Sequence, residues 1–385
     1  MSGLYIHIPF CKEACSYCDF HFSIALGRKS AMVDCLCREL EERKEFFTGE
    51  ILQSIYFGGG TPSLLTREEL NKLMNTIQGT YRVSKETEFT LEANPDDLSY
   101  DMCQFLRDAG FNRLSIGIQS WHSEDLRMMN RKHSVDDGMS AVSSARKAGI
   151  ENISIDLIYG LPGMDEKQWK ENLEKTFALP ITHLSAYHLT YEPGTKMYHS
   201  EKKGRIKALH EEESIAQYYL LLDEAGRQGF EQYELSNFCR PGYASRHNSA
   251  YWSGAVYLGI GPSAHSYDGK SRSWNIASIR RYMEGIQSGK REFEWEELSE
   301  DDRYNEYIMT SLRTVKGCDP EYISRHFGAE AAAHFMQQAE SYLNRALAMR
   351  KEGYIALTRE GMVVSDHIIS ALMRVGKWKG GKVVG

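Results

Sequence analysis

Three cysteines stand close together near the start of the sequence, in the stretch CKEACSYC. Cys11, Cys15 and Cys18 have the spacing C-x3-C-x2-C, and thiolates so spaced suit a zinc ion or an iron-sulfur cluster. A structural zinc site needs a fourth ligand, for which His7 and His21 are nearby candidates. A cubane cluster held by three thiolates keeps one iron without a protein ligand, and that iron can bind a substrate or cofactor through nitrogen and oxygen atoms. The spacing therefore predicts a metal centre of one of these two kinds.

Composition restricts the class of protein. The 385 residues are 42% hydrophobic and 26% charged, which predicts a soluble globular protein of about two domains. No apolar run is long enough to span a membrane, and the strand-like LYIHI begins where a signal peptide would have its charged and apolar regions, so we expect a cytoplasmic protein. In that reducing compartment the eight cysteines are expected to be thiols or ligands. The net charge of -7 gives no overall basic footprint for nucleic acid.

Six short strand-like runs, each followed by a segment with helical periodicity, predict parallel βα units. The runs lie at residues 4–8, 54–57, 88–92, 113–118, 152–157 and 183–187. Such units form either a barrel or a doubly wound sheet. The cysteine loop, GGGTP, Glu92 and Gln119 follow or end the first four runs, and Asp156 lies in the fifth. Because the carboxyl ends of barrel strands meet at one mouth, this placement favours the barrel.

The rest of the chain changes character twice. Residues 196–297 are rich in Gly, Ser, Tyr and His and are interpreted as a connecting region with lid or binding loops. Residues 298–385 predict helices near 301–315, 319–327 and 331–351, followed by a hairpin in GYIALTREGMVVS, an order typical of a winged-helix module. From Glu297 to Gly385 there are 12 Lys and Arg against 12 Asp and Glu, so a packing or docking role is favoured over DNA binding. Residues 1–195 are expected to form the barrel.

Several motifs together resemble the radical S-adenosylmethionine (SAM) superfamily. The cysteine motif followed by FGGGTP carries this resemblance, and YIHIPFC with CSYCDF is similar to the coproporphyrinogen oxidase-like branch of the superfamily. The motifs LEANP, SIGIQS, MNRKH and DLIYGLPG extend the resemblance through most of the chain. HNSAYW, at residues 247–252, fits the H-N-x-x-Y-W motif associated with heme binding in the heme-chaperone family of that branch. The resemblance implies an α/β fold with a partial (β/α)6 radical SAM barrel and a helical, winged-helix-like C-terminal domain.

The resemblance also implies two cofactors and the residues that hold them. Cys11, Cys15 and Cys18 match ligands of a [4Fe-4S] cluster whose open iron chelates the amine and carboxylate of SAM. Residues matching cofactor contacts are Tyr5, Gly59, Gly60, Thr61, Glu92, Gln119, Arg131 and Asp156. Glycine lacks a side chain, so backbone at 58–60 can approach the methionyl amino group closely. In the related oxidase, positions matching Thr61, Gln119, Arg131 and Asp156 contact a second SAM, and Arg131 is equally suited to pair with a porphyrin propionate.

For heme, the hexapeptide supplies suitable groups. A neutral imidazole from His247 is a suitable axial ligand, and Tyr251 and Trp252 are suited to cover the macrocycle. His265 and Cys239 are weaker candidates for the same role.

Two functions fit these motifs. The first is a heme chaperone that passes heme to an acceptor hemoprotein, such as a respiratory one, with transient membrane association during delivery. The second is an oxygen-independent coproporphyrinogen III oxidase that decarboxylates propionates by radical chemistry. Those oxidases carry an N-terminal extension and a further cysteine where Phe20 stands here, so the sequence favours the chaperone. A winged-helix regulator is disfavoured by the balanced charge of the C-terminal region, and no nucleic-acid partner is expected.

Overall fold

The computed structural model of the chain describes residues 2–374. It divides into two units. Unit 1 comprises residues 2–232, 236–250 and 255–295, and unit 2 comprises residues 233–235, 251–254 and the described residues from 296 onward. The division of the chain at residues 195 and 297 stays a prediction.

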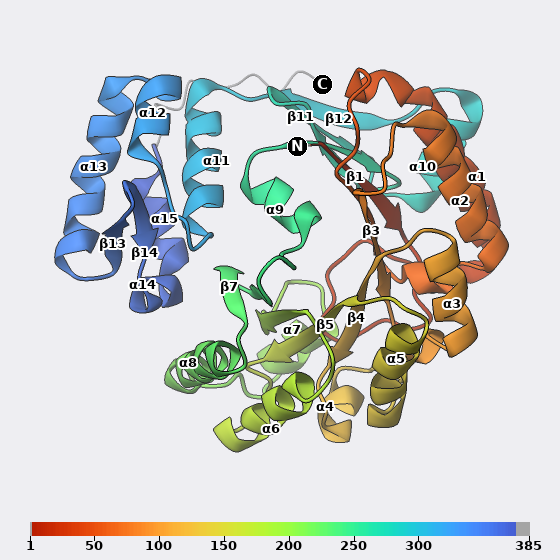
Figure 1. Cartoon of the computed structure of the whole chain (residues 1–385), viewed down its shortest axis with the longest axis horizontal. Helices are drawn as coiled ribbons and strands as arrows, with labels where there is room; N and C mark the ends of the chain where they lie inside the picture. The colour runs from red at the N-terminus through yellow and green to blue at the C-terminus, as the bar shows by residue number, and fades with distance from the viewer. Residues whose placement is uncertain (1, 375–385) are drawn as a thin grey trace. The chain divides into compact units, whose positions relative to one another are not determined.

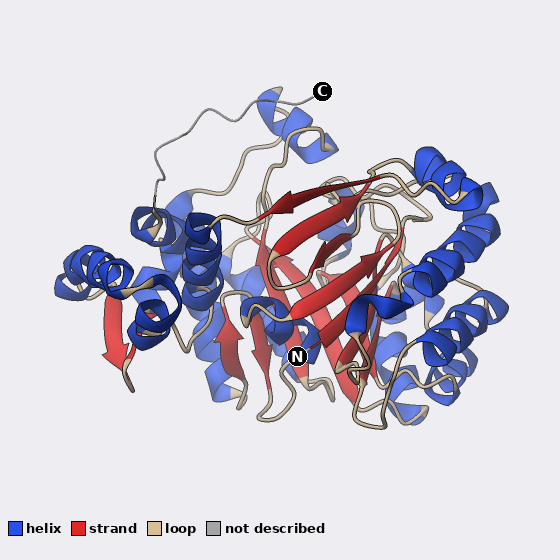
Figure 2. Cartoon of the chain, turned by 90° about the horizontal axis from the view of Figure 1, so that it is seen from above, coloured by secondary structure: helices blue, strands red, loops and turns tan. Residues whose placement is uncertain are grey.

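Unit 1 is built on six parallel strands that follow one another in both sequence and space (Figure 1). They are β1 (Ser2–Ile8), β2 (Ser54–Gly59), β3 (Glu88–Ala93), β4 (Arg113–Gln119), β5 (Asn152–Tyr159) and β6 (His183–His188). Each expected strand is present. The order 1-2-3-4-5-6 has no reversal, whereas a doubly wound sheet reverses at a switch point, so the barrel expectation is confirmed. Figure 2 shows these strands as one curved sheet with helices along its outer side.

Helices follow the strands and cover the outer face of the sheet. They are α1 (Lys29–Glu42), α2 (Arg67–Thr80), α3 (Tyr100–Asp108), α4 (Ser123–Met128), α5 (Val135–Lys147) and α6 (Glu166–Phe177). Short 3-10 helices lie at Leu26–Arg28, Lys44–Phe47, Pro62–Leu64 and Pro95–Asp97. Helix α2 begins where a capping box predicts it, because Thr66 accepts from the Glu69 amide and the Glu69 carboxylate accepts from the Thr66 amide.

Apolar and polar residues alternate along the barrel strands. In β2, Ile55 and Phe57 are fully buried in the outer layer, whereas Ser54 and Tyr56 make polar contacts on the inner side. The same alternation gives the interior a set of polar side chains: His7, Thr90, Glu92, Arg113, Ser115, Ser154, Asp156, His183 and Ser185. Several of these side chains bond to one another, as Ser154 Oγ does to His183 Nδ1 at 2.8 Å. The barrel interior is therefore polar, and the hydrophobic core lies between sheet and helices.

Residues 196–297 differ from the expected loop system. They contain α7 (Lys196–Lys202), α8 (Glu211–Arg227), β7 (Glu231–Glu234), β8 (Asn237–Cys239), α9 (Arg246–Trp252), β9 (Val256–Ile260), β10 (His265–Tyr267), β11 (Ser271–Asn275), α10 (Ile279–Ser288) and β12 (Phe293–Glu297). Strand β8 pairs antiparallel with β6, and β9 pairs parallel with β1, so the region extends the sheet at both edges. These strands are only three to five residues long and lie in sequence rich in Gly and Ser. They therefore show no hydrophobic periodicity from which they could be predicted.

The long stretch of unit 2 consists of helices and one hairpin. Its elements are α11 (Glu300–Leu312), α12 (Pro320–Phe327), α13 (Ala329–Asn344), β13 (Ala348–Lys351), β14 (Tyr354–Leu357), α14 (Arg359–Val363) and α15 (Ser365–Leu372). This agrees with the helical C-terminal region expected from the sequence. The hairpin lies earlier than predicted, because Glu352 and Gly353 take positive φ angles of 52° and 87° and turn the chain there. Thr358 then caps α14, so the second half of the predicted hairpin is helical.

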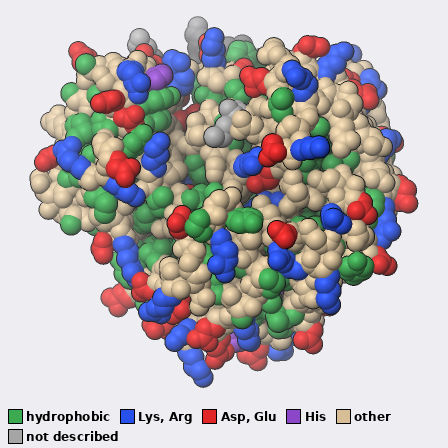
Figure 3. Space-filling view, in the orientation of Figure 1, with side chains coloured by type: hydrophobic (Ala, Val, Ile, Leu, Met, Phe, Trp, Pro, Cys, Tyr) green, Lys and Arg blue, Asp and Glu red, His purple; other side chains and the backbone are tan. Residues whose placement is uncertain are grey.

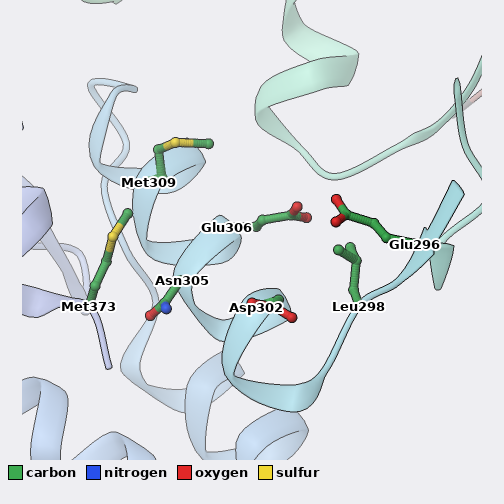
Figure 4. A pocket seen from close by; sticks show the side chains of 7 residues that line it. All are labelled: Glu296, Leu298, Asp302, Asn305, Glu306, Met309 and Met373. Atoms are coloured by element: carbon green, nitrogen blue, oxygen red, sulfur yellow. The ribbon is translucent and has the colours of Figure 1, made fainter. Parts of the chain in front are cut away.

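A pocket of about 230 Å³ lies within unit 2, and the residues that line it are Glu296, Leu298, Asp302, Asn305, Glu306, Met309 and Met373. The carboxylates of Glu296 and Glu306 face one another across it (Figure 4). None of the residues predicted to form the functional site lines this pocket.

Neither the surface in Figure 3 nor the described helices carry a basic or membrane-spanning feature. On the face drawn in Figure 3, basic and acidic side chains are interspersed and form no continuous basic patch. Within residues 2–374, no helix has both the length and the apolar character needed to cross a membrane.

Candidate functional site

The cysteine loop follows β1 and is fixed by contacts with neighbouring segments. The Cys11 amide donates to the Ser23 carbonyl at 3.0 Å. The Ser16 amide donates to the Met129 carbonyl at 3.0 Å, and Asn130 Nδ2 donates to the Ala14 carbonyl at 2.8 Å. The loop is therefore held by the segment between α4 and α5, which carries the MNRKH motif. On the other side of the loop, Lys12 forms ion pairs with the adjacent carboxylates that follow β3, Asp96 and Asp97.

The three cysteines are half-buried thiols that form no disulfide. Burial raises the pKa of Cys11 and raises that of Cys18 to about 12, so metal binding would displace their protons. Within the described chain, no three Cys, His, Asp or Glu side chains converge closely enough to hold a single metal ion. A cubane cluster instead needs thiolates spaced around a four-iron core, which suits three cysteines on one loop.

Arg131 supplies positive charge beside this loop. Its Nη1 lies 3.7 Å from Cys15 Sγ, and its Nη2 donates to Asn94 Oδ1 at 2.8 Å and to the Gly117 carbonyl at 2.6 Å. Its Nε is buried and has no hydrogen-bond partner among the described residues. Because thiolates and cluster sulfides carry negative charge, a buried guanidinium next to Cys15 fits a cluster at this loop. The donor set therefore fits the [4Fe-4S] cluster that the sequence predicts.

His7 is fully engaged and is a poor fourth ligand for zinc. Its Nδ1 bonds with the Tyr5 hydroxyl at 3.1 Å, and its Nε2 bonds with the His21 carbonyl at 2.9 Å. Burial lowers the pKa of His7 to about 4, which keeps the ring neutral. His21 Nε2 is buried and has no hydrogen-bond partner within residues 2–374. The ring of His7 thus links Tyr5, one of the predicted cofactor contacts, to the segment that follows Cys18.

The glycines at the end of β2 leave no room for a side chain, because atoms of neighbouring segments lie too close to them. A Cβ on Gly59 would lie 2.5 Å from His7 Nδ1, at a φ of +106°. A Cβ on Gly60 would lie 2.6 Å from the Phe10 carbonyl oxygen, in the backbone that leads into the cysteine loop. A Cβ on Gly58 would lie 3.1 Å from Glu92 Oε1. Glycine here allows β2, the start of the cysteine loop and Glu92 to pack against one another.

Glu92 lies at the end of β3, beside these glycines. Its Oε1 accepts from the Tyr56 hydroxyl at 2.7 Å, and its Oε2 accepts from the Gly59 amide at 3.2 Å. Burial raises the pKa of the Glu92 carboxyl to about 7; the Tyr56 hydrogen bond partly opposes the rise and the nearby Asp156 adds to it. A carboxylate oriented in this way can accept hydrogen bonds from a ribose or an ammonium group.

Of the other predicted cofactor contacts, Thr61 follows β2, Gln119 ends β4 and Asp156 lies within β5. Asp156 accepts from Ser115 Oγ, with 3.0 and 3.1 Å to its two oxygens. Gln119 has a φ of 67° and follows a bulge in β4, a strained backbone that tends to mark functional positions. Thr61 is buried directly after the glycines, and its hydroxyl contacts the Cys11 thiol. Thr61, Gln119 and the cysteine loop therefore lie at the carboxyl ends of barrel strands, and Asp156 lies on the inner face of β5.

His247 was expected in a binding loop, but it is buried in a helix. It lies in the first turn of α9, and only 3% of its side chain is exposed. Its Nδ1 bonds with Ser54 Oγ at 2.9 Å, and its ring stacks on Tyr56 with 4.9 Å between centroids. Burial, together with the positive charge of Arg113, lowers the pKa of His247 to about 3. Its role as a heme ligand stays a prediction.

The two weaker candidates for a heme ligand, His265 and Cys239, lie on different strands, β10 and β8. His265 is exposed in β10 and stacks on Trp274 with 5.6 Å between ring centroids. Cys239 is buried in β8, and burial raises its pKa to about 11, as expected for a structural thiol.

Four interior residues belong to the site without having been predicted from the sequence in these roles: His7, Tyr56, Glu88 and Arg113. Arg113 is 1% exposed, forms no ion pair among the described residues, and its charge acts on Glu92, Asp156 and His247. The alternation in SIYFGG, EFTLEA and RLSIGIQ is the signal that identifies such inward-facing positions.

Comparison with known proteins agrees with this arrangement. The profile of the radical SAM superfamily matches residues 5–176, and that of the HemN C-terminal domain matches residues 298–364. The solved structure of coproporphyrinogen III oxidase (HemN) from Escherichia coli superposes with a TM-score of 0.84 at 23% identity, covering 97% of this chain and 90% of that one. Parallel βα units that carry three thiols on the first loop and glycines at the next strand end thus define a radical SAM fold.

Curated relatives resolve the family further. The heme chaperone HemW of Bacillus subtilis is 33% identical over 97% of this chain and 99% of its own length. HemW of Lactococcus lactis is 32% identical over 97% of both chains. The chain belongs to the heme chaperone HemW family.

Proposed function

We propose that this protein is a heme chaperone, which binds heme and transfers it to acceptor hemoproteins while carrying a [4Fe-4S] cluster and SAM. The observation that carries the proposal is the near full-length similarity to HemW chaperones of two organisms, together with the H-N-x-x-Y-W hexapeptide at 247–252. We place the protein in the cytoplasm. Its proposed partners are heme and an acceptor such as a respiratory hemoprotein, reached by transient contact with a membrane; nucleic acid is not among them.

The proposed cluster ligands are Cys11, Cys15 and Cys18. Arg131 would balance the charge of the cluster, and the backbone of Gly59 and Gly60 would stand beside it. When bound, the cluster supplies an open iron for the amine and carboxylate of SAM. Tyr5, Thr61, Glu92, Gln119, Arg131 and Asp156 are the proposed contacts of SAM. Glu92 supports this role because both of its oxygens are already oriented, by Tyr56 and by the Gly59 amide.

For heme, we propose His247 as the axial ligand. The neutral imidazole is the form that binds iron, and an imidazole of ordinary pKa is mostly neutral at physiological pH.

Coproporphyrinogen decarboxylation is the alternative activity within the same fold. Phe20 stands where the oxidases carry a further cysteine, and its side chain is 65% exposed beside the cysteine loop. Phenylalanine cannot donate a proton or ligate a metal, so any step that needs a thiol at this place is absent. Phe20 therefore favours the chaperone over the oxidase.

The experiment that separates the two activities uses the protein with its cluster reconstituted under anaerobic conditions. Reductant and SAM are added with either heme or coproporphyrinogen III, and 5'-deoxyadenosine, decarboxylated porphyrinogen and the heme spectrum are followed together. The proposal predicts stoichiometric heme binding without decarboxylated product. Turnover of coproporphyrinogen III to protoporphyrinogen would instead assign the oxidase function.

A further inference from the structure

Helix α9 contains the heme-binding motif, and the carboxylate of Glu88 binds the backbone amides at its start. Glu88 is the first residue of β3 and is buried. Its Oε2 accepts from the Arg246 amide at 3.1 Å, and its Oε1 accepts from the His247 amide at 3.1 Å. Amides in the first turn of a helix have no partner within the helix, and a carboxylate stabilises them by charge-assisted hydrogen bonds. Glu88 thereby fixes the start of α9 against the interior of unit 1.

From α9, contacts lead directly to the proposed SAM site. The His247 ring is bonded to Ser54 and stacked on Tyr56, with 24° between the ring planes. The Tyr56 hydroxyl in turn donates to Glu92 at 2.7 Å. Two contacts therefore connect His247 to the carboxylate proposed to bind SAM, and Tyr56 takes part in both.

This arrangement conflicts with heme ligation by the same histidine. Tyr56 and Tyr5 both stack against the His247 ring, with centroids 4.9 and 6.3 Å away, and only 3% of the side chain is exposed. A macrocycle needs open space around the iron-bound nitrogen, and a ring packed on tyrosines inside a barrel does not offer it. His247 must leave its place under Tyr56 before it can ligate iron.

We propose that α9 has two alternative positions, a docked one in which the protein binds SAM and a released one in which it binds heme. Glu88 is the positioning residue that holds α9 in the docked position. With α9 docked, His247 supports Tyr56, and Tyr56 orients Glu92 for SAM. With α9 released, His247 ligates heme, and Tyr56 loses its stacking partner. This inference rests on the proposed function for its heme part. Because coupling between two sites is reciprocal, SAM weakens heme binding by the same factor by which heme weakens SAM binding.

The first test needs no heme. SAM affinity is measured by equilibrium dialysis on protein with a reconstituted cluster, for the natural chain, Glu88→Gln and the matched control Glu86→Gln. Glutamine keeps one acceptor oxygen but turns an amino group toward the second backbone amide, so α9 docks more weakly. Glu86 is exposed, and its side chain lies outside these contacts. We expect about tenfold weaker SAM binding for Glu88→Gln, equivalent to about 1.4 kcal/mol, and no change for Glu86→Gln.

The second test titrates heme into the same three proteins with and without saturating SAM. SAM is expected to weaken heme binding about tenfold in the natural chain and in Glu86→Gln. Glu88→Gln is expected to bind heme more tightly, with a smaller response to SAM. Ser54→Ala, which removes the bond to His247 Nδ1, provides a second variant with the same expected direction if Glu88→Gln does not fold.

The outcomes separate this inference from the proposed function. Unchanged SAM affinity in folded Glu88→Gln or, where that variant does not fold, in Ser54→Ala would overturn the role of the α9 contacts. Weaker SAM binding in these variants, with a heme titration that SAM does not alter, would keep Glu88 as a positioning residue and overturn the antagonism. A heme titration unaffected by His247→Ala would reject the ligand role of His247, while the heme-free test would still decide the role of Glu88.

Discussion

The hydroxyl of Tyr56 donates to Glu92 Oε1 at 2.7 Å, which joins the neighbouring strands β2 and β3 at the proposed SAM site. Tyr56 was not identified from the sequence, yet it orients the carboxylate that was. The first prediction concerns the charge of this carboxylate.

SAM binding is expected to depend on pH through Glu92. Burial raises the pKa of Glu92 to about 7, so the carboxylate that accepts hydrogen bonds from SAM forms as the pH rises through this value. SAM affinity should therefore fall below pH 7, by about tenfold per pH unit at most, and level off above it. Equilibrium dialysis between pH 5.5 and 8.5 measures this, and Glu92→Gln should bind weakly with a flat profile. A natural chain with a flat profile would contradict the role of Glu92.

The same shift has a consequence for stability. Between pH 4.5 and about 7 the folded state keeps a proton on Glu92 that the unfolded state releases, so this group lowers the free energy of unfolding as the pH rises through that window. In urea titrations, the loss of stability from pH 5 to pH 7 should be smaller for Glu92→Gln than for the natural chain. An identical loss in both proteins would count against a raised pKa.

Gly59→Ala is expected to damage the fold at the site. The positive φ of 106° costs an L residue about 1–2 kcal/mol, and the new methyl group would overlap His7, 2.5 Å away. A Cβ on Gly79, in α2, meets nothing within 4 Å, so Gly79→Ala should be neutral or stabilise by about 0.5–1 kcal/mol. Urea denaturation compares the two. Equal stability of the two variants would refute the close packing of Gly59 on His7.

Replacing Cys11, Cys15 and Cys18 together by alanine should abolish the brown iron-sulfur chromophore, with absorption near roughly 400 nm. Iron and sulfide are assayed after anaerobic purification. Cys37→Ala is the control, because Cys37 is buried in α1 and takes no part in the loop, so iron content should be kept. A triple variant that retains iron and sulfide would show that the cluster is held elsewhere.

His247→Ala should weaken heme binding at least about tenfold, because an axial ligand is lost, and should leave the iron and sulfide of the cluster unchanged. His265→Ala is the control, since His265 is exposed in β10. Titrations followed by the heme Soret band measure both. If His265→Ala weakened heme binding more than His247→Ala, His265 and not His247 would be the axial ligand.

The sequence predicted the barrel strands and the C-terminal helices well, and it did not reveal the short strands within residues 196–297. Runs such as RLSIGIQ are long, rich in branched residues and followed by clear helical periods, so all six parallel strands were found. Strands β8 and β9 have five residues at most and depend on pairing with β6 and β1, contacts between residues far apart in the chain. Such pairing overrides weak local preference and leaves no local signal.

For the candidate site, motifs located the cysteines, the glycines and Glu92, because those positions depend on residue type and spacing. They did not locate His247 inside the barrel. That burial depends on Glu88 and Ser54, residues 159 and 193 positions away along the chain. A histidine in a segment rich in Gly, Ser and Tyr resembles a loop residue until those partners are known.

Transfer of bound heme to an acceptor is the step that defines a heme chaperone. The protein is loaded with heme, freed of excess heme on a desalting column, and mixed with an apo-form b-type hemoprotein bound to a resin, so that the two proteins separate by filtration. We expect heme to leave this protein and to appear in the acceptor with the acceptor's own Soret spectrum, faster than from heme-loaded serum albumin. Heme that stays with the protein, or that reaches the acceptor no faster than from albumin, would contradict the chaperone function.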